Sequence, residues 1–98
     1  KRNYALQKQQ YDKRGFCIEI KNFNQNKELC LDAKGVAIYH FTYDKWGNCL
    51  HEAFYGIDNT PVVNQRGYAK AIYTYDIHNH RIEATYYDVK GRPISLKQ

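Results

Sequence analysis

The sequence predicts an all-β protein made of tandem β-hairpin repeats, in which three units with a period of 32 form an extended, twisted antiparallel ribbon or solenoid-like sheet. Three observations support this fold class. The dipeptide Tyr-Asp recurs at a fixed interval, each Tyr-Asp opens a sequence typical of a tight turn, and β-branched and aromatic residues dominate the stretches between the turns.

The repeat is clearest in the Tyr-Asp pairs, which begin at Tyr11, Tyr43 and Tyr75 and therefore recur with a constant period of 32. The same register aligns many other positions without a gap, which chance would not sustain along a whole chain. Examples are Gly35 with Gly67, Pro61 with Pro93, and Phe23 with Tyr55 and Tyr87. The chain divides into units 3–34, 35–66 and 67–98 of one repeat segment, and we expect that segment to belong to a longer protein.

The residues after each Tyr-Asp predict a type I turn. Asp is favoured at the first position of such a turn, where its side chain accepts backbone N–H groups, and Gly at the fourth position adopts the left-handed conformation that leads into a bulge. A second, related turn follows at an offset of 12, and the first turn of the next unit at a further offset of 20. A column of carboxylates could also indicate catalysis or Ca²⁺ binding, but turn chemistry explains it, so we assign these residues to architecture: Asp12, Gly15, Asp44, Gly47, Asp76, Asn79, Asp88 and Gly91.

The strands are predicted on either side of the first turn. Residues 35–43 and 67–75 form the arms before it, and residues 48–55 and 80–87 form the arms that return. The short stretches 60–64 and 92–95 contain proline, which removes a donor from a strand ladder, so we interpret them as edge strands or as links to the next unit. Two long arms per unit keep every hairpin in the same orientation, which a third full strand would not.

Composition narrows the class of protein. A hydrophobic fraction of 43% argues against disorder, and no apolar run is long enough to span a membrane. The net charge of +5 comes from Lys and Arg scattered among Asp and Glu, which indicates a charged surface and not a nucleic-acid site. Three cysteines cannot all pair within one chain. Of these, Cys30 aligns with apolar residues and is expected in the core, whereas Cys17 and Cys49 align with Arg81 and are expected to face solvent.

No catalytic or metal-binding pattern emerges, so we expect no enzyme activity, no metal and no cofactor. The four histidines fall in columns filled elsewhere by unrelated residue types, and no cysteine has a base specified beside it. The strongest candidate for binding is Trp46, at a turn tip where burial is not required; it could stack on a sugar ring, contact a partner protein or pack on the next repeat. We add Tyr39, Tyr68 and His51 as candidate binding residues.

Two stretches resemble a known family. Tyr-Asp-Lys-Trp-Gly-Asn at 43–48 and Tyr-Tyr-Asp-Val-Lys-Gly-Arg-Pro at 86–93 resemble the YD-repeat, or Rhs-like, hairpin repeats of bacterial surface and multidomain proteins. The period of 32 and the Gly-Tyr-Ala link at Gly67 depart from that family's usual shorter and less regular spacing, so a closed shell is not implied. The resemblance implies a bacterial protein, at the cell surface or secreted, that uses hairpins as a scaffold.

Two functions follow as hypotheses. The first is a non-enzymatic scaffold that binds a protein partner or neighbouring repeats and domains of the parent chain. The second is a module that binds a polysaccharide or cell wall through exposed aromatic side chains. In either case the open edges of the sheet predict weak self-association.

Overall fold

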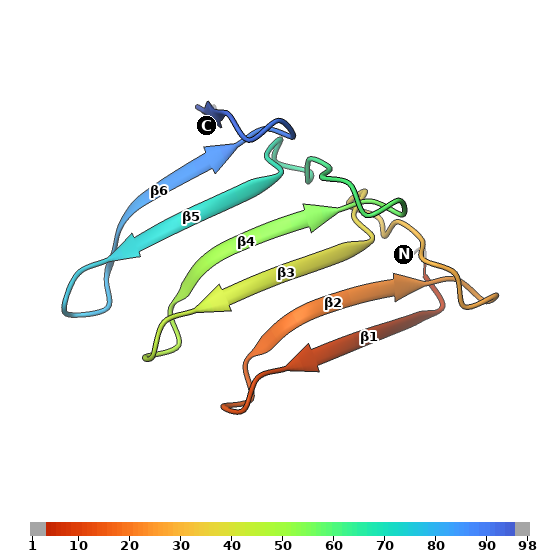
Figure 1. Cartoon of the computed structure of the whole chain (residues 1–98), viewed down its shortest axis with the longest axis horizontal. Coiled ribbons are helices and arrows are strands. Elements are labelled where there is room, and N and C mark those ends of the chain that lie inside the picture. The colour runs from red at the N-terminus through yellow and green to blue at the C-terminus, as the bar shows by residue number, and fades with distance from the viewer. Residues whose placement is uncertain (1–3, 96–98) are drawn as a thin grey trace.

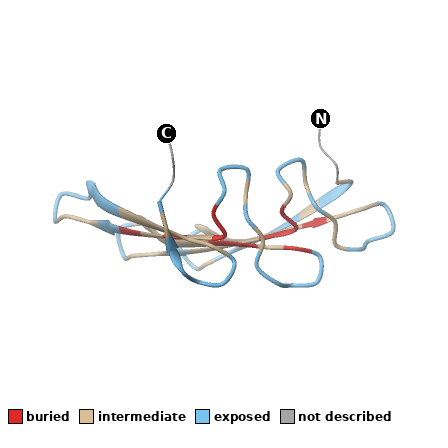
Figure 2. Cartoon of the chain, turned by 90° about the horizontal axis from the view of Figure 1, so that it is seen from above, coloured by how far each residue is buried: buried red, intermediate tan, exposed pale blue. Residues whose placement is uncertain are grey.

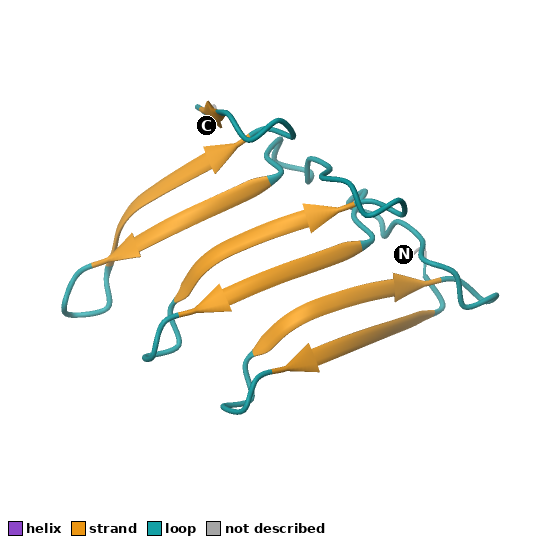
Figure 3. Ribbon diagram, in the orientation of Figure 1, coloured by secondary structure: helices purple, strands orange, loops and turns teal. Residues whose placement is uncertain are grey.

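Residues 4–95 of the computed structural model form one antiparallel sheet in which seven strands lie side by side in chain order (Figure 1). These described residues contain no helix (Figure 3), which confirms the all-β prediction. The strands are β1 (Leu6–Tyr11), β2 (Cys17–Phe23), β3 (Ile38–Tyr43), β4 (Cys49–Tyr55), β5 (Lys70–Tyr75), β6 (Arg81–Tyr87) and β7 (Pro93–Ile94).

The six long strands make three hairpins that all point the same way (Figure 1). The first strands of the hairpins begin at Leu6, Ile38 and Lys70, and this spacing equals the period of the Tyr-Asp pairs. The segments that follow the hairpins add little to the sheet: after β2 there is a bridge from Phe23 to Leu29, after β4 a bridge from Tyr55 to Pro61, and after β6 the two residues of β7. Successive hairpins therefore keep one orientation, and the sheet extends as a ribbon with dimensions of 46 × 33 × 23 Å.

The arms of the hairpins start later than the sequence suggested. Strands were expected from Gly35 and Gly67, but β3 and β5 begin three residues further on, at Ile38 and Lys70. The reason is a third turn at the end of each of the first two units, because the N–H of Gly35 donates to the carbonyl of Asp32 and that of Gly67 to the carbonyl of Asn64. The two glycines have φ of 84° and 98°, so they close a turn and do not extend a strand.

Seen edge-on, the sheet is a single layer, and loops leave it on both sides (Figure 2). Apolar burial is concentrated on one face, where Val36 and Tyr68 fold back from the links onto the strands. The ring of Tyr68 lies 5.7 Å from that of Phe54 and 4.6 Å from that of Tyr86. The core is thus a stripe of aromatic rings between the links and the sheet, and its buried members are Val36, Phe54, Tyr68, Ala71 and Tyr73.

Neighbouring hairpins are joined by a short ladder and by tyrosine hydroxyls. Strand β3 pairs with β2 over three residue pairs, and the same holds for β5 with β4. Nearer the tips, the Tyr43 hydroxyl donates to the carbonyl of Cys17 at 2.7 Å, and the Tyr75 hydroxyl donates to the carbonyl of Cys49 at 2.6 Å. The recurring tyrosine therefore ties each hairpin to the one before it, while the aspartate that follows it builds the turn.

Candidate functional site

The aspartates and asparagines that begin the turns use a side-chain oxygen to bind the turn backbone. Asp76 shows the pattern: its Oδ1 accepts the N–H groups of His78 and His80, each at 2.9 Å. Its own N–H donates to the carbonyl of His80, and its carbonyl accepts the N–H of Asn79. The same four bonds recur in seven of the tight turns between residues 4 and 95, which begin at Asp12, Asn24, Asp32, Asp44, Asn64, Asp76 and Asp88.

These bonds lower the pKa of several turn carboxylates. The N–H of His80 is the main cause that lowers the pKa of Asp76, and the N–H of Arg92 does the same for the pKa of Asp88. In Asp44 desolvation acts in the opposite direction, but the bonds from Asn48 and Trp46 outweigh it and the pKa is lowered. The oxygens of these aspartates are thus engaged by the backbone that they shape.

The fourth residue of each turn has a positive φ. Gly47 at 88° and Asn79 at 66° are equivalent residues in successive hairpins, and asparagine tolerates this conformation better than most residues. Gly47 has a second constraint. A Cβ placed there would lie 2.7 Å from Cζ of Phe16, a residue of the preceding hairpin. The glycine therefore also allows the Phe16 ring to lie against the neighbouring tip.

Trp46 lies at the tip of the β3–β4 hairpin with 65% of its surface exposed. The Nζ of Lys45 lies 4.7 Å from the centre of its ring, which forms a cation–π contact within the same turn. Trp46 is equivalent by position to Arg14 and His78 of the adjacent tips, which are also exposed. Because the ring is exposed, it is not packed on the next repeat, and a sugar or a partner protein remains as its possible contact.

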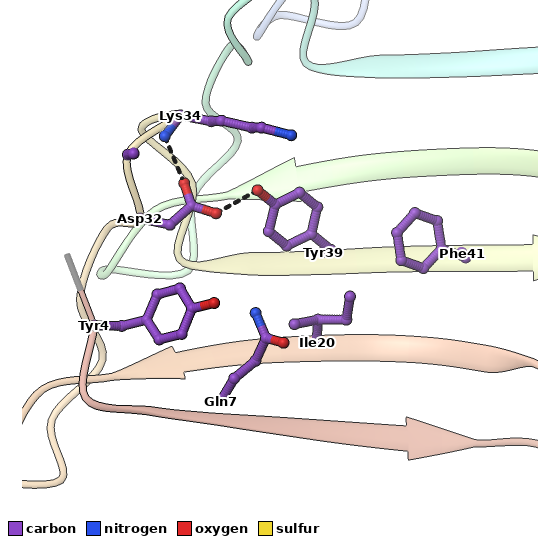
Figure 4. A pocket seen from close by; sticks show the side chains of 8 residues that line it. Tyr4, Gln7, Ile20, Asp32, Lys34, Tyr39 and Phe41 are labelled. Carbon is purple, nitrogen blue, oxygen red and sulfur yellow. Dashed lines mark hydrogen bonds between the residues drawn. The ribbon is translucent and has the colours of Figure 1, made fainter. Parts of the chain in front are cut away.

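Tyr39 borders an open hollow of about 480 Å³ on the first two hairpins (Figure 4). Its hydroxyl donates to Oδ2 of Asp32, whose Oδ1 accepts the backbone N–H of Lys34 at 2.9 Å. Burial, and after it this hydrogen bond, raise the pKa of the Tyr39 phenol. Ligand sites combine apolar walls with a few polar groups in this way and have similar volumes. The hollow is lined by Tyr4, Gln7, Ile20, Asp32, Ala33, Lys34, Tyr39 and Phe41.

The two hairpin interfaces are filled by different side chains. At the second interface Tyr68 fills the space beside Phe54, and its hydroxyl donates to Glu52 at 3.0 Å. At the first, the position of Tyr68 is taken by the smaller Val36, and that of Phe54 by Asn22. Tyr68 itself is only 3% exposed, so it is a core residue, which removes it from the exposed aromatic side chains suggested by the sequence.

Asn22 organises a polar network at the position that Phe54 occupies one unit later. It is fully buried, its Nδ2 donates to the carbonyl of Val36 at 3.2 Å, and its Oδ1 accepts from Nε2 of Gln7 at 3.0 Å. Its Nδ2 also lies 3.4 Å from Oδ2 of Asp32, the carboxylate that accepts from Tyr39. Gln7, Asn22, Asp32 and Tyr39 therefore form a continuous chain of hydrogen bonds beside the hollow.

His51 lies on the other face of the sheet, away from Tyr39. It is opposite Thr42 in β3 and Ile72 in β5, and burial is the main cause that lowers the pKa of its imidazole. On the same face, Nε2 of His40 lies 2.8 Å from Oε2 of Glu19. Within residues 4–95 no three His, Cys, Asp or Glu side chains lie close enough together to hold a metal ion.

The three cysteines are all half-buried, and no disulfide joins them. Cys49 was expected to face solvent, but it packs against the aromatic core, and burial raises the pKa of its thiol. Arg81, its equivalent in the third unit, is exposed on the last long strand. The exposure of a residue therefore depends on its place in the ribbon and cannot be inferred from the residue types at equivalent positions. Cys30 is also half-buried, and its N–H donates to the carbonyl of Asn22.

Three features of the site were missed from the sequence. The turns at Asp32 and Asn64 had a visible signal, because Asp32-Ala33-Lys34-Gly35 has the same Asp-x-x-Gly pattern as the tip turns and precedes Asp44 by the offset of 12 already seen between related turns. Asn22 and Glu52 had none, because their roles depend on contacts between different hairpins. Glu52 accepts the hydroxyls of both Tyr68 and Tyr73 through one oxygen.

The geometry defines a class of protein: a single-layer, open sheet of repeated hairpins with one aromatic face and exposed turn tips. Comparison with protein-family models, with curated proteins and with solved structures gives no match. Among the described residues no helix is long and apolar enough to cross a membrane.

Proposed function

We propose that the chain is a non-enzymatic structural and interaction module, which acts as a scaffold or protein-binding surface within a larger bacterial protein. The observation that best supports this proposal is the use of the recurring residues in architecture. The aspartates bind turn backbone, as Asp44 does through the N–H groups of Trp46 and Asn48. The tyrosines join hairpins, as Tyr75 does through the carbonyl of Cys49. The recurring aspartates and tyrosines, which could otherwise be candidates for catalysis, thus have structural partners.

The ribbon geometry fits a scaffold. Each hairpin meets the next through the same three residue pairs and the same tyrosine hydroxyl, so the interface can be repeated without a change of geometry. Hairpin tips then lie in a row along one side of the sheet (Figure 1), where residues such as Trp46 are held at fixed spacing. A partner protein would contact this row of tips, where exposed side chains differ from hairpin to hairpin.

A tandem fusion tests the scaffold. Residues 1–98 joined directly to a second copy of residues 3–98 keep the period of 32 across the junction. In a repeat scaffold the junction forms a new hairpin interface, so the urea midpoint of the fusion should exceed that of the single chain. A matched control places a flexible Gly-Ser linker between the copies. Equal midpoints for all three proteins would contradict the proposal.

A second function, the binding of polysaccharide, is favoured by the exposed ring of Trp46 and by the hollow beside Tyr39. Sugars are bound by aromatic stacking combined with directed hydrogen bonds, and the hollow is lined by the ring of Phe41 and by the exposed side chain of Lys34, whose amine can donate. Affinity electrophoresis in gels that contain cell-wall polysaccharides would detect such binding. Retardation lost in Trp46→Ala or Tyr39→Ala would favour this function, and migration unaffected by any polysaccharide would exclude it.

A further inference from the structure

The two open edges of the sheet correspond to the two sides of one interface that is already present inside the molecule. At the internal interfaces, Glu19, Ile20 and Lys21 of β2 pair with His40, Tyr39 and Ile38 of β3. The pairing of β4 with β5 has the same register, displaced by one period. A displacement by one more period on β6 gives Glu83, Ala84 and Thr85, and the matching residues of β1 are Lys8, Gln7 and Leu6.

From this correspondence we propose that two copies of the chain associate head to tail, with β1 of one copy added to the outer edge of β6 of the other. The proposal rests on the scaffold function and names its partner as a second copy. The register would place Lys8 opposite Glu83, Gln7 opposite Ala84 and Leu6 opposite Thr85. Because the two surfaces are different, the contact does not close on itself, and a chain of copies results.

Exposure at the two edges supports this arrangement. Ile82 of β6 is 65% exposed, whereas its equivalents on β2 and β4, Ile18 and Leu50, are partly covered in the ribbon. Leu6 of β1 is 45% exposed, whereas its equivalent Ile38 is 3% exposed. The apolar side chains that are open at the edges thus occupy positions that become covered where one hairpin meets another.

Hydrogen bonds and charge point to the same register. Tyr43 and Tyr75 donate to the carbonyls of Cys17 and Cys49, and by the same displacement Tyr11 of the second copy would donate to the carbonyl of Arg81. The Tyr11 ring is 53% exposed, and its hydroxyl, which donates to the side chain of Gln9 in the single copy, would exchange this exposed partner for the carbonyl. Lysine on an edge strand commonly opposes edge-to-edge pairing, but here Lys8 meets an exposed glutamate and is paired.

Sedimentation velocity over a range of concentrations tests the proposal, with a charge swap that is specific to the register. The wild-type chain should show concentration-dependent association. Lys8→Glu and Glu83→Lys each place like charges opposite one another, and each should weaken the association constant by roughly fivefold. The double variant restores opposite charges and should recover the wild-type association constant. Lys8 and Glu83 are exposed, so far-ultraviolet circular dichroism should be unchanged in all three variants.

A mixture of the two single variants gives a second test of the register. Within either variant alone every contact between copies places like charges opposite one another. Between the two variants the charges are opposite in both orders, because the glutamate introduced at position 8 faces the lysine introduced at position 83, and the unchanged Lys8 faces the unchanged Glu83. The mixture should therefore associate more strongly than either variant alone at the same total concentration.

Two results would overturn the proposal: a strictly monomeric wild-type chain, or association that neither the double variant nor the mixture restores. If the chain is monomeric but the tandem fusion is stabilised, the scaffold function stands and only the docking of separate copies is refuted.

Discussion

Gly47 and Gly15 are equivalent residues in the tip turns of successive hairpins, and the same alanine substitution at each separates two physical effects. Both glycines have a positive φ, of 88° and 91° respectively. A Cβ at Gly15 would have no atom within 4 Å, whereas at Gly47 it would lie 2.7 Å from Cζ of Phe16. Both substitutions therefore strain the backbone, but only Gly47→Ala also displaces a side chain of the neighbouring hairpin.

The magnitudes follow from these contacts. A non-glycine residue in the left-handed region costs about 1–2 kcal/mol, which applies to both variants. In Gly47→Ala the Phe16 ring must also move away from Tyr43, whose ring centre is 5.2 Å away, and from the guanidinium of Arg14 at 4.7 Å. The loss of an aromatic pair costs about 0.5–1.5 kcal/mol. We therefore expect Gly47→Ala to lower the free energy of unfolding by about 1 kcal/mol more than Gly15→Ala.

Urea unfolding followed by circular dichroism measures the difference, and a double-mutant cycle with Phe16→Ala assigns its cause. In the Phe16→Ala background the two glycine variants should be equally destabilised, because the ring that Gly47 accommodates is gone. An extra destabilisation of about 1 kcal/mol corresponds to a melting temperature lower by about 4–8 °C in a protein of this size. Equal effects of Gly47→Ala and Gly15→Ala in the wild-type background would refute the argument.

Three further predictions concern the turns, the phenols and a thiol. Asp44→Ala should lower the melting temperature by about 4–8 °C, because two backbone N–H groups lose their acceptor. Asp44→Asn keeps an acceptor and should lower the melting temperature less, and thermal unfolding of both variants measures the difference. Burial raises the pKa of Tyr39 and of Tyr73 in the folded state above the value of 10.0 of an unfolded tyrosine. The stabilisation from the neutral phenols should therefore be complete below pH 10.0 and fall as the pH rises above it. Urea midpoints that stay constant as the pH is raised through that value would contradict this prediction. Burial also raises the pKa of the Cys49 thiol, so iodoacetamide should modify it more slowly in the native protein than in urea, as peptide mass mapping would measure.

The fold class was predictable because it depends on local chemistry that repeats. Asp followed three residues later by Gly specifies a turn wherever it occurs, and aromatic and β-branched residues between turns favour strands. Because each unit has two long strands, an even number, the sequence also predicted that all hairpins have one orientation, and the strand order agrees. The predicted offsets of 12 and then 20 were incomplete, because a turn at Asp32 or Asn64 divides the second offset into 8 and 12.

The candidate site was less predictable, because exposure depends on contacts between hairpins. Tyr68 and Tyr39 are both tyrosines near the start of a hairpin, yet Tyr68 is 3% exposed and Tyr39 borders a hollow. Both rings pack against Phe54, with ring centres 5.7 Å away for Tyr68 and 5.6 Å away for Tyr39. Tyr68 is also covered by the ring of Tyr86 of β6 at 4.6 Å, whereas the hydroxyl of Tyr39 donates to Asp32 beside the hollow. A pattern within one unit carries no information about what the adjacent unit places opposite it.

The departures from the repeat are therefore the most informative positions for function. Where the units agree, the shared residues maintain the turn and the hydrogen bond from the tyrosine hydroxyl to the preceding hairpin. Substitutions at these positions should act mainly on stability. Where they differ, the ribbon keeps its geometry while its side chains change: Trp46 stands at a tip where the neighbours have Arg14 and His78, and Val36 and Tyr39 of one interface are replaced by Tyr68 and Ala71 at the next. A partner that recognises this chain among similar hairpins must read those differences. Substitutions at the exposed Trp46 should consequently change binding with little effect on folding.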